Sequence, residues 1–393
     1  MFEKLQEQQP GSLLGLLIAY QADPRPNKID LGVGVYRNAS GETPVMRAVK
    51  AAEKYLQETQ DSKRYIGREG DLTYVELLKP IIFGAESGLI AQTVGLQTPG
   101  GCGAIRLGAD VIAAASPQAS IWLGTPGWPS HNLFFEQSRQ PIREYPFFDL
   151  TTQTILFDKV VETLQTARAG DVILLHGCCH NPTGENFTAE QWSQITQLLV
   201  ERKLVPFMDL AYQGLGDGLE ADARPLRQVL EAVDEAIISY SCDKNFGLYR
   251  DRVGALFLMS KNERELRIAG TNAAACAAPN WGMPPDHGAS VVRTILQSAE
   301  LTAIWKAELE EMCARVNGNR AALANAHPEL AFIKRQGGLF STLSMSSDTA
   351  RALRKNYGIY FADSGRMNLA GMQLADVEPI IKALIAEGVL QAL

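Results

Sequence analysis

The segment AIISYSCDKNFGLYRDRVGALF, residues 236–257, contains a lone lysine just beyond an apolar run that predicts a buried strand. Burial of Lys244 would lower the pKa of its amine, and such an amine is a nucleophile able to form a Schiff base. Ser241 and Arg252 flank the lysine with donors suited to an anionic phosphate. The segment therefore predicts a lysine that holds a phosphorylated carbonyl cofactor. The alternative is a surface lysine in a turn.

On both sides of this segment, short apolar runs alternate with longer stretches of helical periodicity. Such alternation is typical of right-handed crossovers and predicts an α/β fold with a mainly parallel sheet. Ligands in open α/β sheets bind beyond the carboxyl ends of the strands, so the loops there are expected to share one crevice. We expect strands at 120–124, 171–176, 204–210, 236–241 and 253–260, and helices at 72–85, 104–115, 189–203 and 224–233.

The last third of the chain has a different pattern. Residues 301–326 have the periodicity of a long amphipathic helix, and shorter alternating segments and a final helix follow. The opening residues lack a core of their own and are expected to join this part. We predict a large domain over 44–311 and a smaller α+β domain formed by 1–43 and 312–393.

Composition excludes several classes of protein. The chain has 393 residues, of which 46% are hydrophobic, and its net charge of −7 gives no support to nucleic-acid binding. Five histidines argue against a histidine-rich metal site. The six cysteines form no CxxC pair, which is typical of a reduced, cytoplasmic protein. No apolar run is long enough to predict a membrane span.

Two segments predict surfaces for a flat, phosphorylated ligand. The Gly-rich stretch from Thr98 to Ile112 opens a helix, where glycines and free N–H groups favour a phosphate, although such turns are common. Trp128 lies between Pro126, Gly127 and Pro129, where it can be a wall for a planar ligand or a core residue.

Charged and polar side chains follow other apolar runs. Asp209 closes the strand at 204–210, and a buried carboxylate is costly unless a cation, such as a pyridinium nitrogen, meets it. Tyr212 follows three residues later and can reach the same ligand. Arg366 lies inside an apolar run and is expected to bind an anion. Asn181, in HNPTG, can belong to this group or be a plain turn residue.

Taken together, the motifs HGCCHNPTG (176–184), DLAYQG (209–214) and KNFGLYRDRVGA (244–255) make the chain resemble the class I aminotransferases. The nearer resemblance is to the aspartate and aromatic amino-acid aminotransferase family, and it runs nearly end to end. It implies the fold type I of enzymes that use pyridoxal 5′-phosphate, with a seven-stranded, mainly parallel sheet. It also implies a homodimer with shared active sites, in which the N-terminal arm contacts the partner subunit.

The resemblance assigns roles to the residues around the cofactor ring. Lys244 matches the lysine that forms the Schiff base and moves a proton between the substrate Cα and the cofactor. Asp209 matches the acid that keeps the pyridine nitrogen protonated, with His131 behind it. Tyr212 matches the phenol that bonds the ring oxygen, and Asn181 matches an amide that bonds this oxygen and meets the substrate carboxylate.

Other matches concern the phosphate and the substrate. Arg366 matches the bidentate clamp for the α-carboxylate, which suits guanidinium geometry. Tyr65 matches a tyrosine that reaches the neighbouring subunit's phosphate. The remaining matches are Trp128 and Ala211 on the two ring faces, Gly34 beside the substrate, and Gly101, Cys102, Ser241 and Arg252 around the phosphate.

One departure from the family bears on the substrate. The resemblance implies that dicarboxylate-specific members have an arginine, which arrives from the partner subunit, where this chain has Ala278. Loss of such a charge-assisted pair costs roughly 2–5 kcal/mol, so aspartate is expected to lose much of its advantage. Either aromatic or other neutral side chains are favoured, with Trp281 and Met283 as an apolar wall, or Arg37 supplies the missing charge.

Two further departures concern the phosphate and the lysine. Cys102 stands where a threonine is usual, and a thiol is a weaker donor. Asp243 stands where a serine is usual, immediately before the lysine, and strand alternation predicts that it points away from the site. The resulting hypothesis is an aminotransferase acting on an L-amino acid and a 2-oxo acid such as 2-oxoglutarate. The alternatives are an aspartate aminotransferase that uses Arg37, a pyridoxal-phosphate β-elimination lyase, and a non-catalytic regulator.

Overall fold

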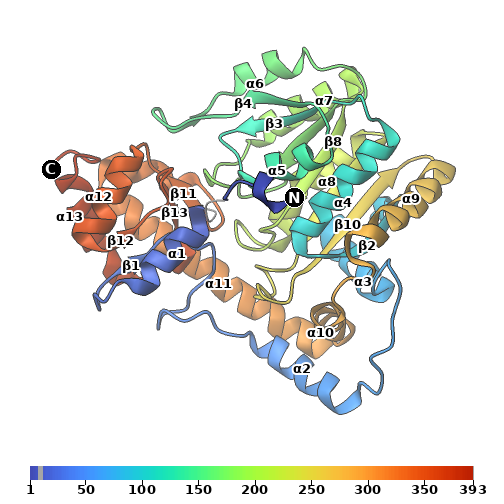
Figure 1. The fold of residues 1–393 in the computed structure, drawn as a ribbon, viewed down its shortest axis with the longest axis horizontal. Helices are drawn as coiled ribbons and strands as arrows, with labels where there is room; N and C mark the ends of the chain where they lie inside the picture. The colour runs from blue at the N-terminus through green and yellow to red at the C-terminus, as the bar shows by residue number, and fades with distance from the viewer. Residues whose placement is uncertain (8–11, 393) are drawn as a thin grey trace.

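The computed structural model describes residues 1–7 and 12–392, and its centre is a seven-stranded sheet (Figure 1). Strand β10 runs antiparallel to both of its neighbours, and the other pairings are parallel. The prediction of a mainly parallel α/β sheet is therefore confirmed. In sheet order the strands are β2 (Thr93–Pro99), β10 (Val253–Ser260), β9 (Glu235–Ser241), β8 (Val205–Leu210), β7 (Val172–His176), β3 (Ile121–Thr125) and β4 (Ile142–Pro146).

Helices cover both faces of this sheet, because alternate residues of each buried strand point to opposite faces. On β8, Phe207 packs into the core on one face, whereas Met208 packs into the core on the other. The first face is covered by α4 (Gly100–Ala115), α5 (Ser130–Gln137) and α9 (Glu263–Trp281). The second is covered by α2 (Arg47–Thr59), α3 (Leu72–Phe83), α6 (Phe157–Leu164), α7 (Ala189–Arg202), α8 (Leu219–Ala232), α10 (Asp286–Gln297) and α11 (Ala299–Ala326).

Helix α11 joins two hydrophobic cores. Trp305 and Leu309, near its start, belong to the core beneath the sheet, whereas Leu323 and Ala324 belong to a third core. Figure 1 shows the helix running from α10 to the group around α12 and α13. The third core contains residues from β1 (Ile29–Asp30), β12 (Ile359–Tyr360), β13 (Arg366–Asn368), α12 (Ser347–Tyr357) and α13 (Val377–Ala386).

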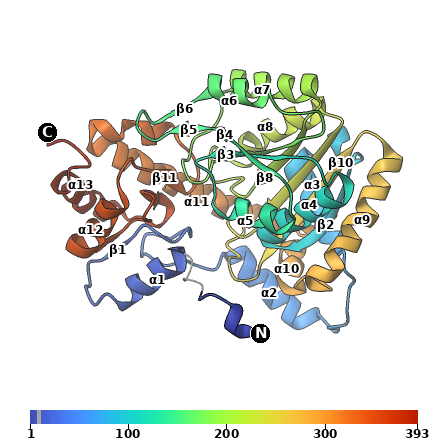
Figure 2. The same cartoon turned by 45° about the horizontal axis from the view of Figure 1, so that its top comes forward.

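Short pairings complete this second group, which Figure 2 shows beside the sheet. Strand β1 pairs in parallel with β12, and β11 (Phe340–Thr342) pairs antiparallel with β13. An early segment of the chain is thus joined to the last third, which supports the proposed second domain; the boundaries at 43/44 and 311/312 stay a prediction. The remaining elements are α1 (Ser12–Ala22), the hairpin β5 (Phe148–Asp149) and β6 (Thr154–Ile155), and the 3-10 turns Phe2–Lys4, Gly88–Ile90, Pro328–Arg335, Leu369–Gly371 and Leu374–Asp376.

Residues 1–7 project from the rest of the chain in Figure 2, and Phe2 and Leu5 are exposed. Residues 8–11 of the predicted N-terminal arm lie outside the described structure. Among the described helices, none combines the length and the apolar character that crossing a bilayer requires.

Candidate active site

A cavity of about 260 Å³ lies at the edge of the sheet where β3, β7, β8 and β9 have their carboxyl ends. The loops after these strands supply Trp128, Asn181, Tyr212 and Lys244, as the rule for open α/β sheets predicts. Residues from the second group of elements close the other side. The lining consists of Gly34, Gly101, Cys102, Ile105, Trp128, His176, Asn181, Asp209, Ala211, Tyr212, Ser241, Asp243, Lys244, Tyr249, Arg252, Phe340 and Arg366.

The cavity thus brings together the predicted ring, phosphate and substrate residues, although their roles stay predictions. His131 lies behind the wall, in contact with Asp209. Tyr65 is the exception, because it does not line the cavity and its side chain is 89% exposed. Its predicted contact involves a second subunit.

Lys244 lies in the turn that follows β9. Its ammonium is 5.6 Å from the centre of the Tyr212 ring. In the part of the chain that the structure describes, its Nζ has no hydrogen-bond or ion-pair partner. The amine is therefore free to react with a ligand in the cavity.

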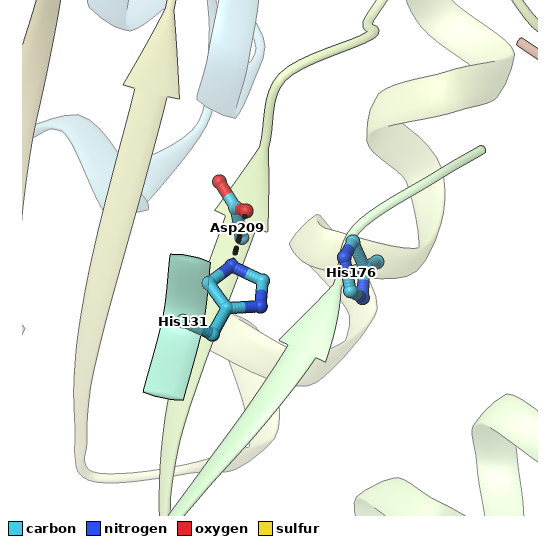
Figure 3. A group of neighbouring side chains, drawn as sticks. All are labelled: His131, His176 and Asp209. Atoms are coloured by element: carbon cyan, nitrogen blue, oxygen red, sulfur yellow. Dashed lines mark hydrogen bonds and ion pairs between the residues drawn. The ribbon is translucent and has the colours of Figure 1, made fainter. Parts of the chain in front are cut away.

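Asp209 is buried near the end of β8 and makes two side-chain hydrogen bonds. Its Oδ2 is hydrogen-bonded to Nε2 of His131 (Figure 3), at 3.0 Å, and its Oδ1 accepts a 2.8 Å bond from the Ser239 hydroxyl. Burial would raise the pKa of this carboxyl, but the hydrogen bonds from His131 and Ser239 help to lower it below its ordinary value. Asp209 therefore presents a negative charge to the cavity.

Three histidines form a row behind this carboxylate. The rings of His131 and His176 are 5.3 Å apart, and those of His176 and His180 are 4.2 Å apart. His180 also stacks on Phe147 at 4.1 Å. Burial lowers the pKa of His176 from 6.5 to about 3 and that of His180 well below 6.5, so both are neutral near pH 7.

We expect the urea concentration at the midpoint of unfolding to decrease when the pH is lowered from about 7.5 to about 5. Histidines of the unfolded chain take up protons near pH 6.5, whereas folded His176 does so only near pH 3. Because the unfolded chain binds more protons in that window, stability falls as the pH is lowered. The free energy of unfolding decreases by at most about 1.4 kcal/mol per pH unit for each histidine that stays neutral in the folded protein. The decrease is smaller for His176, which is partly exposed.

The double variant His176→Gln, His180→Gln is the control for this pH dependence. We expect its midpoint to change less between the two pH values than that of the wild type. Equal losses in both proteins would contradict the assignment to these histidines.

Arg366, on β13, is a buried cation with no carboxylate partner among the described residues. Its guanidinium lies 4.3 Å from the Phe340 ring centre, and its Nη2 donates to the carbonyl of Gly32 at 3.1 Å. Its Nε has no hydrogen-bond partner. Burial lowers the pKa of the group from 12.5, so an incoming anion would relieve an unpaired charge.

Tyr212 and Asn181 are neighbours in the cavity lining. The Asn181 amide donates to the Tyr212 hydroxyl at 3.4 Å. Burial raises the pKa of the Tyr212 phenol, while the charge of Arg366 lowers it. The phenol is therefore a neutral donor.

The prediction that Asp243 points away from the site is wrong. Its side chain lines the cavity and forms an ion pair with Arg252. The reason is that β9 ends at Ser241, so Asp243 lies in the following turn, where the alternation of a strand no longer fixes the side chain's direction.

Several lining residues were not predicted. His176 is the last residue of a predicted strand, so the rule used for Asp209 could have found it. Tyr249 lies inside the segment that contains Lys244. Ile105 lies inside the Gly-rich stretch, in the second turn of α4. Phe340 has no local signal, because the β11–β13 pairing brings it beside Arg366.

Arg37 does not line the cavity. Its guanidinium forms an ion pair with Asp30, so its charge is already compensated. Trp281 and Met283 do not line the cavity of their own chain either, so they do not form the predicted apolar wall there. Ala278 lies in the last turn of α9.

A sequence model described as aminotransferase class I and II matches residues 26–384. The chain is 46% identical over 384 residues to a tyrosine aminotransferase from Rhizobium meliloti (strain 1021), with 97% of this chain and 98% of the relative covered. It is 40% identical over 396 residues to an aspartate aminotransferase from Escherichia coli (strain K12), with 98% and 100% covered.

The fold also matches solved structures. One is an aromatic-amino-acid aminotransferase from Burkholderia pseudomallei covalently bound to pyridoxal phosphate. The TM-score is 0.95 at 34% identity, and 100% of each chain is covered. The Saccharomyces cerevisiae cytoplasmic aspartate aminotransferase has a TM-score of 0.94 at 29% identity, with 98% of each chain covered.

Proposed function

Since the chain belongs to the class I and II aminotransferase family, we propose that its cavity moves the α-amino group from an aromatic or other neutral L-amino acid to a 2-oxo acid. The chain is a pyridoxal-phosphate-dependent aminotransferase. One observation supports this cavity as the site. It brings together the unpaired amine of Lys244, the ionised carboxylate of Asp209 and the unpaired guanidinium of Arg366.

The residues around the cavity fit pyridoxal 5′-phosphate. The Asp209 carboxylate is buried, and a protonated pyridine nitrogen would supply the cation that such a group needs. Ser241, Arg252 and the first N–H groups of α4 offer donors to the phosphate. A Cβ on Gly101 would lie 3.1 Å from the Ser241 Cβ, so glycine keeps the phosphate cup open.

When bound, pyridoxal phosphate supplies a carbonyl that condenses with amines and a ring that withdraws electrons from the amino acid's α-carbon. With the cofactor in place, Lys244 Nζ would be the base that takes the proton from the substrate Cα. Asp209 would hold the positive charge at the ring nitrogen, and the Tyr212 hydroxyl would donate to the ring oxygen. Arg366 binds the α-carboxylate, with Phe340 limiting the rotation of its guanidinium.

The preference for a neutral side chain follows from the charges of the cavity. Lys244, Arg252 and Arg366 are its cations. Arg252 is paired with Asp243, and Lys244 and Arg366 are assigned to the cofactor and to the α-carboxylate. No further lysine or arginine lines it in the described part of the chain, and Arg37 is paired with Asp30. A distal carboxylate would therefore be desolvated without a partner.

The half-reaction in which an amino acid leaves as its 2-oxo acid tests this preference. With the cofactor-loaded protein and no acceptor, we expect phenylalanine and tyrosine to react at least roughly tenfold more efficiently than aspartate. The measurement is the rate of 2-oxo acid formation at several amino-acid concentrations. Aspartate outpacing both aromatic amino acids would contradict the proposal.

Position 278 offers a variant with a gain of function. Ala278→Arg is expected to raise kcat/KM for aspartate roughly 30-fold or more, because it restores a cation worth about 2–5 kcal/mol. Ala275→Arg, at an exposed position on the same helix, is the matched control and should change little.

We also propose a cytoplasmic homodimer with shared active sites. The support is indirect: Tyr65 and the apolar Phe2 and Leu5 are exposed, which suits a surface that a second copy covers. All six cysteines are free, which is typical of a reducing compartment.

A further inference from the structure

A carboxylate lies within the cup that would receive the cofactor's phosphate. The Asp243 side chain is 3% exposed, its Oδ2 pairs with Nη1 of Arg252, and its Oδ1 accepts the Val253 N–H at 3.2 Å. The backbone N–H of Asp243 donates to the Ser241 hydroxyl oxygen at 3.3 Å. The carboxylate is therefore held by Arg252, a predicted phosphate ligand, and the Asp243 backbone bonds a second one, Ser241.

This ion pair uses one of the two terminal nitrogens of the Arg252 guanidinium. Nη1 donates to Asp243 and, at 3.0 Å, to the carbonyl of Tyr249. Nη2 lies 3.8 Å from the Cys102 sulfur. A bidentate grip on phosphate uses two parallel N–H groups, so Asp243 competes with the phosphate for Arg252.

The start of α4 contacts both members of the pair. A Cβ on Gly100 would lie 2.7 Å from Arg252 Nη2 and 3.1 Å from Asp243 Oδ2. Burial raises the pKa of the Cys102 thiol, Arg252 and Lys244 lower it, and Asp243 raises it, so all three charges act at the same point. The cup therefore contains a negative charge where a phosphate of nearly two negative charges would lie.

We propose that Asp243 sets the strength of the phosphate cup: it holds Arg252 in place without an anion and weakens the grip of Arg252 on a phosphate group. This inference rests on the proposed function, because pyridoxal phosphate is the ligand of the cup. Two effects follow from one charge. Removing it leaves Arg252 unpaired in the anion-free protein, which lowers stability, and removes the repulsion of a bound phosphate, which raises affinity.

The test compares the wild type with Asp243→Asn, both as full-length protein stripped of cofactor. Pyridoxal phosphate, inorganic phosphate and pyridoxal are titrated, with binding followed by tryptophan fluorescence and by melting temperature. We expect the variant to bind pyridoxal phosphate and inorganic phosphate roughly tenfold or more tightly, with pyridoxal unchanged. Without ligand, its melting temperature should be lower than that of the wild type.

Asp251→Asn is the matched control, since it removes the same charge from the same loop between β9 and β10 but outside the cavity lining. It should leave all three affinities unchanged. Asp243→Ser, with a smaller neutral side chain, serves as the second variant where the asparagine variant does not fold.

Unchanged or weaker binding of both phosphate ligands by the position-243 variants would overturn the inference. So would an equal gain for pyridoxal, because the effect would then not pass through the phosphate. The proposed function fails differently: a wild-type protein that takes up no pyridoxal phosphate at any concentration would refute it.

Discussion

Lys244→Ala is expected to yield a folded protein whose aminotransferase turnover is reduced at least roughly 10⁴-fold, because the nucleophile and the proton acceptor are lost together. The fold should survive, since the Lys244 ammonium makes no hydrogen bond or ion pair within the described chain and lies 5.6 Å from the centre of the Tyr212 ring. The measurements are steady-state turnover with phenylalanine and 2-oxoglutarate, and thermal unfolding of the cofactor-free protein.

Lys244→Arg is the matched variant for charge. It keeps a cation near Tyr212 but cannot form the covalent link, so its turnover should be as low as that of the alanine variant. Turnover close to that of the wild type in either variant would remove Lys244 from the chemistry.

Asp209→Asn is expected to lower turnover by roughly 10²–10⁴-fold. The neutral amide keeps the size of the side chain near His131 and Ser239 but cannot hold a positive charge on the ring nitrogen. Without that charge the ring withdraws electrons less strongly, so loss of the α-proton slows. The measurement is the rate of 2-oxo acid formation in a single turnover, with the affinity for pyridoxal phosphate measured separately.

Ser239→Ala separates the charge of Asp209 from its hydrogen bonds. It removes the 2.8 Å bond to Oδ1 but leaves the carboxylate ionised beside His131. A loss well below that of Asp209→Asn is expected. Equal losses in the two variants, or no loss in Asp209→Asn, would contradict the role of the charge.

Much of the sheet and of the cavity lining could be predicted because the same short segments contain an apolar run, which indicates a strand, and a charged residue at its end, which indicates a site. Asp209 and Lys244 follow apolar runs that the chain can only bury as strands, and carboxyl ends of parallel strands meet at one edge. The rule needs the strand to be recognised, and it was for β7, β8 and β9. Strands β2 and β4 lie outside the predicted set.

The parts that could not be predicted depend on tertiary pairing or on turn geometry. Phe340 reaches Arg366 only through the β11–β13 register, which no local pattern specifies. Asp243 was misplaced because alternation was extended past Ser241, where the strand ends. The contact predicted for Tyr65 depends on a second copy of the chain.

The covalent link between Lys244 and pyridoxal phosphate is the central claim, and reduction with borohydride tests it most directly. The cofactor-loaded protein is reduced, digested and mapped by mass spectrometry. We expect one phosphopyridoxyl group per chain, on Lys244 in the peptide that contains CDKNFGLYR. A modification found on another lysine, with Lys244 unmodified, would contradict the claim.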